Sequence, residues 1–138
     1  MFAEHGRAYV YLAYGTAFML NVSSEGAGVG AAVLIRAVAP EGGTALMAAR
    51  RGDVIARDLA RGPGRLTQAL GIDRELDGIR LCASPERRID PLFLGQDDCP
   101  VGEIGVSPRI GITKGVDLPL RFFLRGSRFL SGPTWLNA

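Results

Sequence analysis

The chain has 138 residues, of which 47% are hydrophobic and 22% are charged, and this length supports a single domain with one core. Its formal net charge of +2 excludes a polybasic nucleic-acid-binding tail but is compatible with a local basic face. Two cysteines and one histidine exclude a His/Cys metal site, and the lack of a disulfide framework favours a reducing cytoplasm.

The first quarter of the chain predicts three strands. Ala8–Ala13 and Phe18–Ser23 are rich in aromatic and branched residues, and they flank a turn at Tyr14–Ala17. Ala31–Ala37 is apolar enough to be a central strand. The uncharged stretch Ala8–Ser24 is short and contains tyrosines, an asparagine and serines, so we interpret it as paired strands and expect no membrane association.

From residue 44 the pattern becomes helical, with a break at Gly62–Gly64. Thr44 is expected to cap the first helix, Asp53 the second, and Gly71 to end the third. The expected helices are Ala45–Arg50, Asp53–Ala60 and Arg65–Leu70.

The last part of the chain predicts strands again, at Ile79–Ala83, Ile104–Thr113 and Leu120–Leu124, with a polar loop at Ser84–Gly102. Strands therefore occur early and late, around helices in the middle. This order predicts the α+β class: one domain with a mostly antiparallel curved sheet, a protruding β-hairpin and flanking helices.

Three residues depart from a plain strand pattern. Asn21 lies inside an apolar strand, where its amide needs partners, and Arg36 lies on the face of Leu34, where its charge needs one. Tyr14 occupies the expected hairpin tip. Singly, they could be a capping amide, a structural ion pair and a surface ring. Together they fit a hairpin whose aromatic tip fills the gap left by a nucleotide rotated out of a duplex.

Six segments then carry a resemblance to a known family, in family order and over nearly the whole chain. They are Tyr9–Gly15, Asn21–Ser24, Val33–Ala37, Gly62–Gly71, Pro108–Ile112 and Pro119–Ser127. In these segments the sequence resembles the alkyladenine DNA glycosylases, also called 3-methyladenine or methylpurine DNA glycosylases.

The resemblance implies a base excision repair enzyme that flips an alkylated or deaminated purine out of DNA and hydrolyses its N-glycosidic bond. The implied substrates are 3-methyladenine, 7-methylguanine and hypoxanthine, and no metal or cofactor is implied. We therefore expect a monomer that binds double-stranded DNA with a damaged purine in the bacterial cytoplasm, at the nucleoid.

The resemblance also implies roles along the hairpin and the third strand. Tyr14 matches a tyrosine that intercalates at the vacated base position, and Tyr11 matches an aromatic that stacks on the flipped base. Asn21 matches an asparagine whose clash with the exocyclic amine of guanine rejects that base. Leu34 matches an apolar residue that lines the base pocket.

Two further residues match the catalytic part of the family, and one segment matches a DNA contact. Arg36 matches an arginine that holds the attacking water, and Ile110 matches a residue whose backbone carbonyl contacts that water. Gly62, Gly64 and Arg65 lie where a helix opens, so the amides there could receive a DNA phosphate while Arg65 adds charge.

The sequence departs from the family at two places. Thr16 and Ala17 follow the tip glycine, where the family often has a methionine-like residue and an aromatic, so the wedge is smaller. The catalytic glutamate of the family belongs to a Glu-x-Glu-Ala-Tyr segment upstream of the tyrosine strand, and nothing before Tyr9 matches it. We therefore expect residues 1–138 to be the C-terminal part of such a domain, without excision activity and poorly stable alone.

The hairpin register decides whether Tyr11 and Asn21 share a face. An even loop would separate them, whereas a three-residue Gly15–Ala17 loop or a bulge would pair them directly. We predict the odd loop.

Three other interpretations compete with this one. Gly26, Gly28 and Gly30 lack the spacing and the following helix of a dinucleotide-binding loop. Arg61–Leu66 resembles the hairpin of a helix-hairpin-helix motif, which would contact the DNA backbone without excising a base. A non-enzymatic module that binds DNA or is purely structural is also open.

Overall fold

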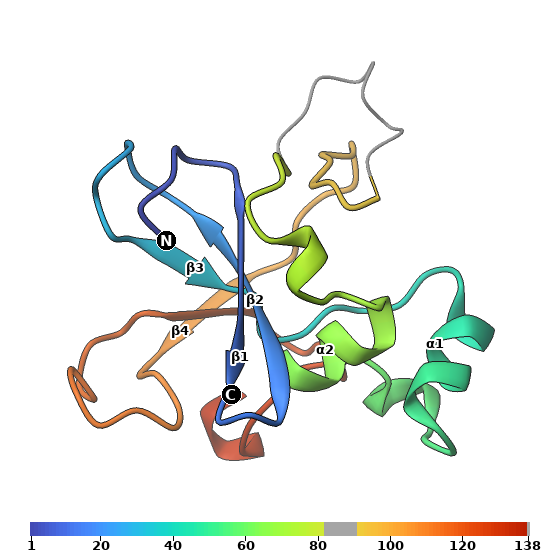
Figure 1. Ribbon diagram of the computed structural model, residues 1–138. Helices are drawn as coiled ribbons and strands as arrows, with labels where there is room; N and C mark the ends of the chain where they lie inside the picture. The colour runs from blue at the N-terminus through green and yellow to red at the C-terminus, as the bar shows by residue number, and fades with distance from the viewer. Residues whose placement is uncertain (82–90, 138) are drawn as a thin grey trace.

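The computed structural model describes residues 1–81 and 91–137, and within them the α+β class is confirmed. Two antiparallel sheets replace the one curved sheet that we expected. The first has the order β1-β2-β3, and the second pairs β4 with β5 (Figure 1). The strands are β1 (Ala8–Ala13), β2 (Ala17–Ser23), β3 (Ala32–Leu34), β4 (Ile104–Ser107) and β5 (Arg121–Leu124).

The core lies between one face of the first sheet and helix α2 (Pro63–Leu70), which packs against β2. Alternation along the strands points Ala8, Val10 and Leu20 to this face, where Leu66 and Ala69 of α2 meet them. The Thr67 hydroxyl also donates to the Phe18 carbonyl at 2.8 Å, which fixes α2 on β2. The opposite face of the sheet carries the tyrosines of β1.

Helix α2 begins earlier than the sequence suggested. Gly62 is its N-cap and Pro63 its first residue, so the Gly-Pro-Gly segment opens the helix instead of interrupting it. The reason is that proline has a fixed φ near the helical value and needs no amide partner in the first turn. Gly71 ends the helix in the left-handed conformation, as predicted.

Helix α1 (Thr44–Arg51) packs beside α2, where the Arg51 guanidinium donates to the Gln68 side chain at 2.7 Å. Thr44 is its first helical residue and Gly43 its N-cap, so the predicted threonine cap is wrong by one position. The predicted helix Asp53–Ala60 is wrong as well. The chain is extended at Ile55, so only the short 3₁₀ turn η1 (Ala56–Asp58) forms.

Three predicted strands are shorter than expected. β3 ends at Leu34 because the chain then turns toward α2, where Ala37 forms a single bridge with Arg61. β4 ends at Ser107 because Pro108 has no amide to donate to a ladder. β5 begins at Arg121.

Within its described residues, 79–81, the predicted strand at Ile79–Ala83 forms a single bridge, between Arg7 and Arg80, next to η2 (Arg74–Leu76). Residues 82–90, which include the end of that strand and the start of the predicted loop, lie outside the described residues.

The hairpin has an odd loop, but its register differs from our prediction. Tyr9 pairs with Asn21 and Tyr11 pairs with Met19, so the loop is Tyr14–Thr16. The loop starts one residue earlier than expected because Tyr14 and Gly15 both adopt positive φ, and the Thr16 amide closes the turn on the Ala13 carbonyl at 3.0 Å. Tyr11 and Asn21 therefore share a face as diagonal neighbours, not as a direct pair.

Candidate nucleic-acid interface

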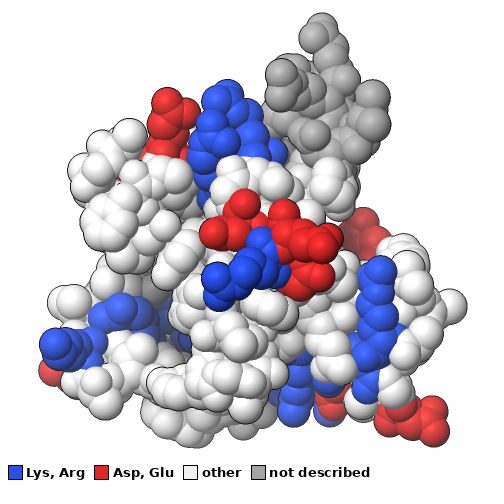
Figure 2. Space-filling model, in the orientation of Figure 1, with Lys and Arg blue, Asp and Glu red and all other residues white. Residues whose placement is uncertain are grey.

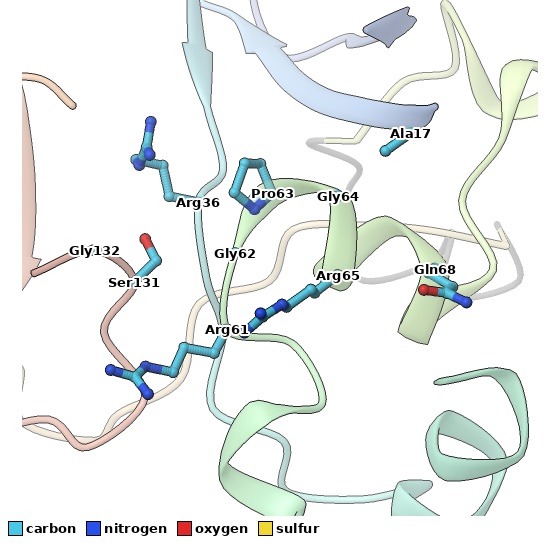
Figure 3. Close-up of a pocket in the computed structure, with 10 residues that line it drawn as sticks. All are labelled: Ala17, Arg36, Arg61, Gly62, Pro63, Gly64, Arg65, Gln68, Ser131 and Gly132. Atoms are coloured by element: carbon cyan, nitrogen blue, oxygen red, sulfur yellow. The ribbon is translucent and has the colours of Figure 1, made fainter. Parts of the chain in front are cut away.

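A pocket of about 560 Å³ opens at the start of α2. Figure 3 shows that its walls come from four parts of the chain: the start of β2, the segment after β3, the start of α2, and the C-terminal segment. The ten described residues that line it are Ala17, Arg36, Arg61, Gly62, Pro63, Gly64, Arg65, Gln68, Ser131 and Gly132. The fold thus brings Arg36 together with all three of the predicted phosphate-binding positions.

Arg36 brings a partly desolvated charge to this pocket. Its Nε is buried and has no hydrogen-bond partner within the described part of the chain, and burial lowers the pKa of its guanidinium. The structural ion pair that would have explained Arg36 is therefore not among the ion pairs of the described residues. A half-buried guanidinium in this state is ready to receive an anion or a polarised water.

A second cation, Arg121, lies close enough to interact with Arg36. Its pKa is lowered first by burial and second by the positive charge of Arg36. The Arg121 guanidinium donates to the Ser107 hydroxyl and to the Ser131 carbonyl, both at 2.9 Å, and lies 4.6 Å from the centroid of the Phe123 ring. These contacts hold Arg121 in place, so its charge adds to the positive potential around Arg36.

The start of α2 presents backbone amides to the same pocket. No side chain caps the helix, and its first residue is a proline, so the amides of Gly64 and Arg65 are the first donors of the helix. Amides in the first turn, together with the helix dipole, favour a bound anion. Arg65 is exposed and adds a full charge at this end.

Gly64 also has a structural reason to be glycine. A Cβ added there would lie 2.8 Å from the Cβ of Ala17, so a larger residue would push α2 away from β2. Gly62 has a φ of 139°, a conformation that residues with a side chain rarely adopt. Both glycines thus shape the pocket as well as lining it.

Ile110 does not line the pocket directly but lies behind its wall. A Cβ added at Gly132 would overlap the Cδ1 of Ile110, so the two residues are in close contact. Gly132 lines the pocket together with Arg36 and contacts the Ile110 side chain, so Gly132 connects the two predicted water-binding residues.

Tyr14 is 98% exposed at the tip of the β1–β2 hairpin, where its φ is 50°. A non-glycine residue with positive φ is uncommon, and a tyrosine ring that is almost fully exposed makes little contact with the protein. The wedge role of Tyr14 stays a prediction; the structure shows an exposed ring at the hairpin tip.

The three predicted base-contacting residues lie on the face of the first sheet opposite the core. Asn21 pairs with Leu34 in the β2–β3 ladder, and Tyr11 stacks at 5.2 Å on the neighbouring ring of Tyr9. The Asn21 amide is buried and donates to the Tyr9 carbonyl at 3.2 Å, so it also has a structural role. None of the three is among the ten described residues that line the pocket.

Five residues that build the pocket or hold its walls had no predicted role in a glycosylase site. Arg61 directly precedes the segment Gly62–Gly71 that resembles the family, and Gln68 lies within it. Arg121 lies in another such segment, so the resemblance could have indicated all three residues. Ser131 and Gly132 could not have been identified from the sequence, because nothing in their local pattern shows that the C-terminal segment returns to α2.

Charge is unevenly distributed over the surface. Figure 2 shows acidic side chains gathered near the middle of the view, over η2, where Asp73, Glu75 and Asp77 are exposed. A polyanion would be repelled there. The uncapped start of α2 and the arginines beside it form the better anion-binding region.

The structure also bears on two sequence expectations about partners. No helix in residues 1–81 and 91–137 is long and apolar enough to cross a membrane. Over the same residues, no group of three His, Cys, Asp or Glu side chains could hold a metal ion.

Comparison with known proteins gives one consistent result. A family model described as methylpurine-DNA glycosylase matches residues 1–128. Three similar relatives, each named for a proposed 3-methyladenine DNA glycosylase activity, come from Mesorhizobium japonicum, Paraburkholderia phytofirmans and Rhodopseudomonas palustris. They are 57%, 47% and 47% identical to 99%, 96% and 96% of this chain. The chain spans 64%, 60% and 63% of their respective lengths.

Proposed function

The chain belongs to the methylpurine-DNA glycosylase family, and we propose that it binds a damaged purine in duplex DNA as part of base excision repair. The observation that carries this proposal is the convergence of Arg36, Arg65 and the uncapped start of α2 on one pocket. We propose that the chain acts as a monomer on alkylated or deaminated purines, at the bacterial nucleoid.

In this proposal the DNA is held by its backbone and opened by the hairpin. A phosphate near the lesion binds the amides of Gly64 and Arg65, and the guanidinium of Arg65 adds charge. Gly62 supports this geometry through its unusual φ. Tyr14 enters the stack and offsets part of the cost of unstacking the damaged nucleotide, which is a few kcal/mol.

The flipped base would be read on the outer face of the first sheet. Tyr11 offers a π-face to an alkylated purine, whose positive charge favours aromatic contact. Asn21 and Leu34, which pair in the neighbouring ladder, would contact the same base. The Asn21 amide is held by the Tyr9 carbonyl, so it is positioned to exclude a base with a further amino group.

The chemical step that the family name suggests is hydrolysis of the N-glycosidic bond. The oxygen of a water molecule bonds to C1′ of the deoxyribose, the bond between C1′ and the purine breaks, and the free base leaves. We propose that Arg36 and the backbone carbonyl of Ile110 hold that water. A general base must accept its proton.

One observation favours a second candidate function, a DNA-binding module without excision activity. The ten described residues that line the pocket include three arginines and neither Asp nor Glu, so the pocket as described contains no carboxylate that could accept a proton. This alternative shares the DNA-binding half of the proposal and differs only in chemistry.

A paired assay separates the two candidates. The purified chain would be incubated in excess with a duplex that contains one hypoxanthine, and binding and single-turnover excision would be measured on the same sample. A chimera carrying the part of the Mesorhizobium japonicum relative that lies outside the match would be assayed in parallel.

Excision by the chain itself supports the enzyme and rejects the binding module. Binding without excision, with excision gained in the chimera, supports a lesion-binding part of a glycosylase. Binding without excision in both proteins supports the module. Failure of the chain to bind either damaged or undamaged duplex contradicts the proposal as a whole.

A further inference from the structure

The C-terminal segment Leu130–Asn137 has a defined position although the family match ends at residue 128. Two arginines fasten it to the rest of the fold. Arg61 donates from Nε to the Leu130 carbonyl at 2.6 Å, and Arg121 donates to the Ser131 carbonyl at 2.9 Å. Arg121 also donates to the side-chain oxygen of Asn137. The segment is thus held near both of its ends.

Trp135 lies between these two anchors and is nevertheless 75% exposed. It belongs to the 3₁₀ turn η4 (Thr134–Asn137), which contacts β4. A tryptophan has one of the largest apolar side chains and is usually well buried. Here the turn is fixed by Asn137 and Ser131 while the indole ring remains outside the protein, so the ring is presented in a defined place.

The position of Trp135 relative to the pocket suggests what the ring contacts. Gly132 lines the pocket and is three residues away along the chain, a separation of at most about 11 Å between Cα atoms. The same pocket carries Arg36, Arg61 and Arg65. An exposed indole on a chain segment that also lines an arginine-rich pocket fits the way proteins hold single-stranded or distorted nucleic acid, with arginines on phosphates and the ring on a base or sugar.

We propose that Trp135 is a nucleic-acid contact and stacks on a base or deoxyribose of the strand whose phosphate occupies the α2 pocket. This inference rests on the proposed function for the presence of DNA, and it adds a contact from the segment beyond the family match. Trp135 and Tyr14 then contact the DNA from two separate parts of the chain, the C-terminal segment and the hairpin tip.

The sequence makes the test direct, because Trp135 is the single tryptophan of the chain. Its fluorescence and its quenching by acrylamide would be measured with and without a duplex that contains one hypoxanthine. Binding of the same duplex would be followed independently by the anisotropy of a fluorophore on the DNA. The variants are Trp135→Ala, Trp135→Phe and, as a matched control, Phe2→Ala, which removes a 62% exposed ring of the N-terminal segment.

The proposal predicts that saturating duplex shields Trp135 from acrylamide. It also predicts that Trp135→Ala weakens binding about fivefold or more, that Trp135→Phe retains most of the affinity, and that Phe2→Ala binds as wild type. Circular dichroism of the Trp135 variants would match that of wild type because the ring is exposed.

Three results would overturn the inference. If the duplex binds while Trp135 stays fully accessible and Trp135→Ala binds normally, the contact is absent and the proposed function stands. If Trp135 is already shielded without DNA and sedimentation shows a dimer, a second copy covers the ring. If the wild-type chain binds no duplex at low salt, both the inference and the proposed function fail.

Discussion

The Nε of Arg61 donates to the backbone carbonyl of Leu130 at 2.6 Å and so connects the segment that leads into α2 to the C-terminal segment. These two residues are far apart in sequence. Arg61 lines the pocket, and Leu130 precedes Ser131 and Gly132, which line it as well. The guanidinium of Arg61 is also paired with Asp58 at 3.2 Å, which fixes its direction. The candidate site is therefore held together by side chains that bind backbone, and its walls can be tested one at a time.

The contact between Arg61 and Leu130 predicts a stability effect. Arg61→Met removes a hydrogen bond from a charged donor and leaves a carbonyl without its partner, so the free energy of unfolding should fall by about 1–3 kcal/mol. Urea denaturation measures the change. Arg57→Met is the control because Arg57 is an exposed partner of the same Asp58, and its effect should stay within about 0.5 kcal/mol. Equal losses in the two variants would contradict this view of Arg61.

The approach of α2 to β2 predicts a packing effect at Gly64. Gly64→Ala places a methyl group 2.8 Å from the Cβ of Ala17, so one element must move and the free energy of unfolding should fall by about 1–3 kcal/mol. Gly42→Ala is a matched control, since a Cβ at Gly42 would meet nothing within 4 Å. Thermal unfolding followed by circular dichroism would compare them. A Gly64→Ala protein as stable as Gly42→Ala would show that α2 does not approach β2 this closely.

The Asp58 carboxyl predicts a pH dependence. Its hydrogen bond with Arg61, reinforced by Arg57, lowers the pKa of this carboxyl below its ordinary value. The stabilisation is therefore fully present above the ordinary aspartate pKa of about 4, and it is lost as the pH falls through the lowered pKa of the folded protein. Urea midpoints of wild type and Asp58→Asn should differ at pH 7, and the difference should shrink as the pH falls below the ordinary aspartate pKa of about 4. A difference that does not change with pH would show that charge is not its source.

Because the ring of Tyr14 is exposed, its removal should weaken DNA binding without lowering the stability of the fold. Tyr14→Ala removes a side chain that is 98% exposed, so the free energy of unfolding should change by less than about 0.5 kcal/mol. Affinity for a duplex containing hypoxanthine should fall about fivefold or more, because a stacking contact is lost. Tyr14→Phe should bind like wild type, since the ring and not the hydroxyl fills the gap. Anisotropy titrations measure all three, and unchanged binding of Tyr14→Ala would remove the hairpin from the interface.

Local patterns were sufficient for the class of the fold and for the hairpin. Branched and aromatic runs around Tyr14 and Gly15 predicted β1 and β2, and the glycine after Leu70 predicted the end of α2. Errors arose where a residue has two structural uses. Pro63 was interpreted as a helix breaker, although proline also favours the first position of a helix. The predicted helix over 53–60 failed because the extended backbone at Ile55 cannot be inferred from its neighbours.

The candidate site was only partly predictable, for a related reason. Arg36, Gly62, Gly64 and Arg65 were identified through family resemblance, and the fold gathers them in one pocket. Ser131 and Gly132 reach the same pocket through long-range hydrogen bonds from Arg61 and Arg121, and no local pattern encodes such bonds. The hairpin loop starts one residue earlier than predicted, and the strand partners shift by two, because Tyr14 adopts a positive φ that sequence alone would assign to Gly15.

The central claim is that the pocket beside Arg36 holds damaged DNA while the flipped base is read on the outer face of the first sheet. The most direct test is the ratio of dissociation constants for an undamaged duplex and for the same duplex with one hypoxanthine, measured by anisotropy for wild type and for Arg36→Gln. The account predicts that wild type prefers the damaged duplex and that Arg36→Gln, folded as judged by circular dichroism, loses about tenfold in affinity for it while binding undamaged DNA nearly as before. A ratio of one in wild type, or a preference that Arg36→Gln leaves intact, would contradict it.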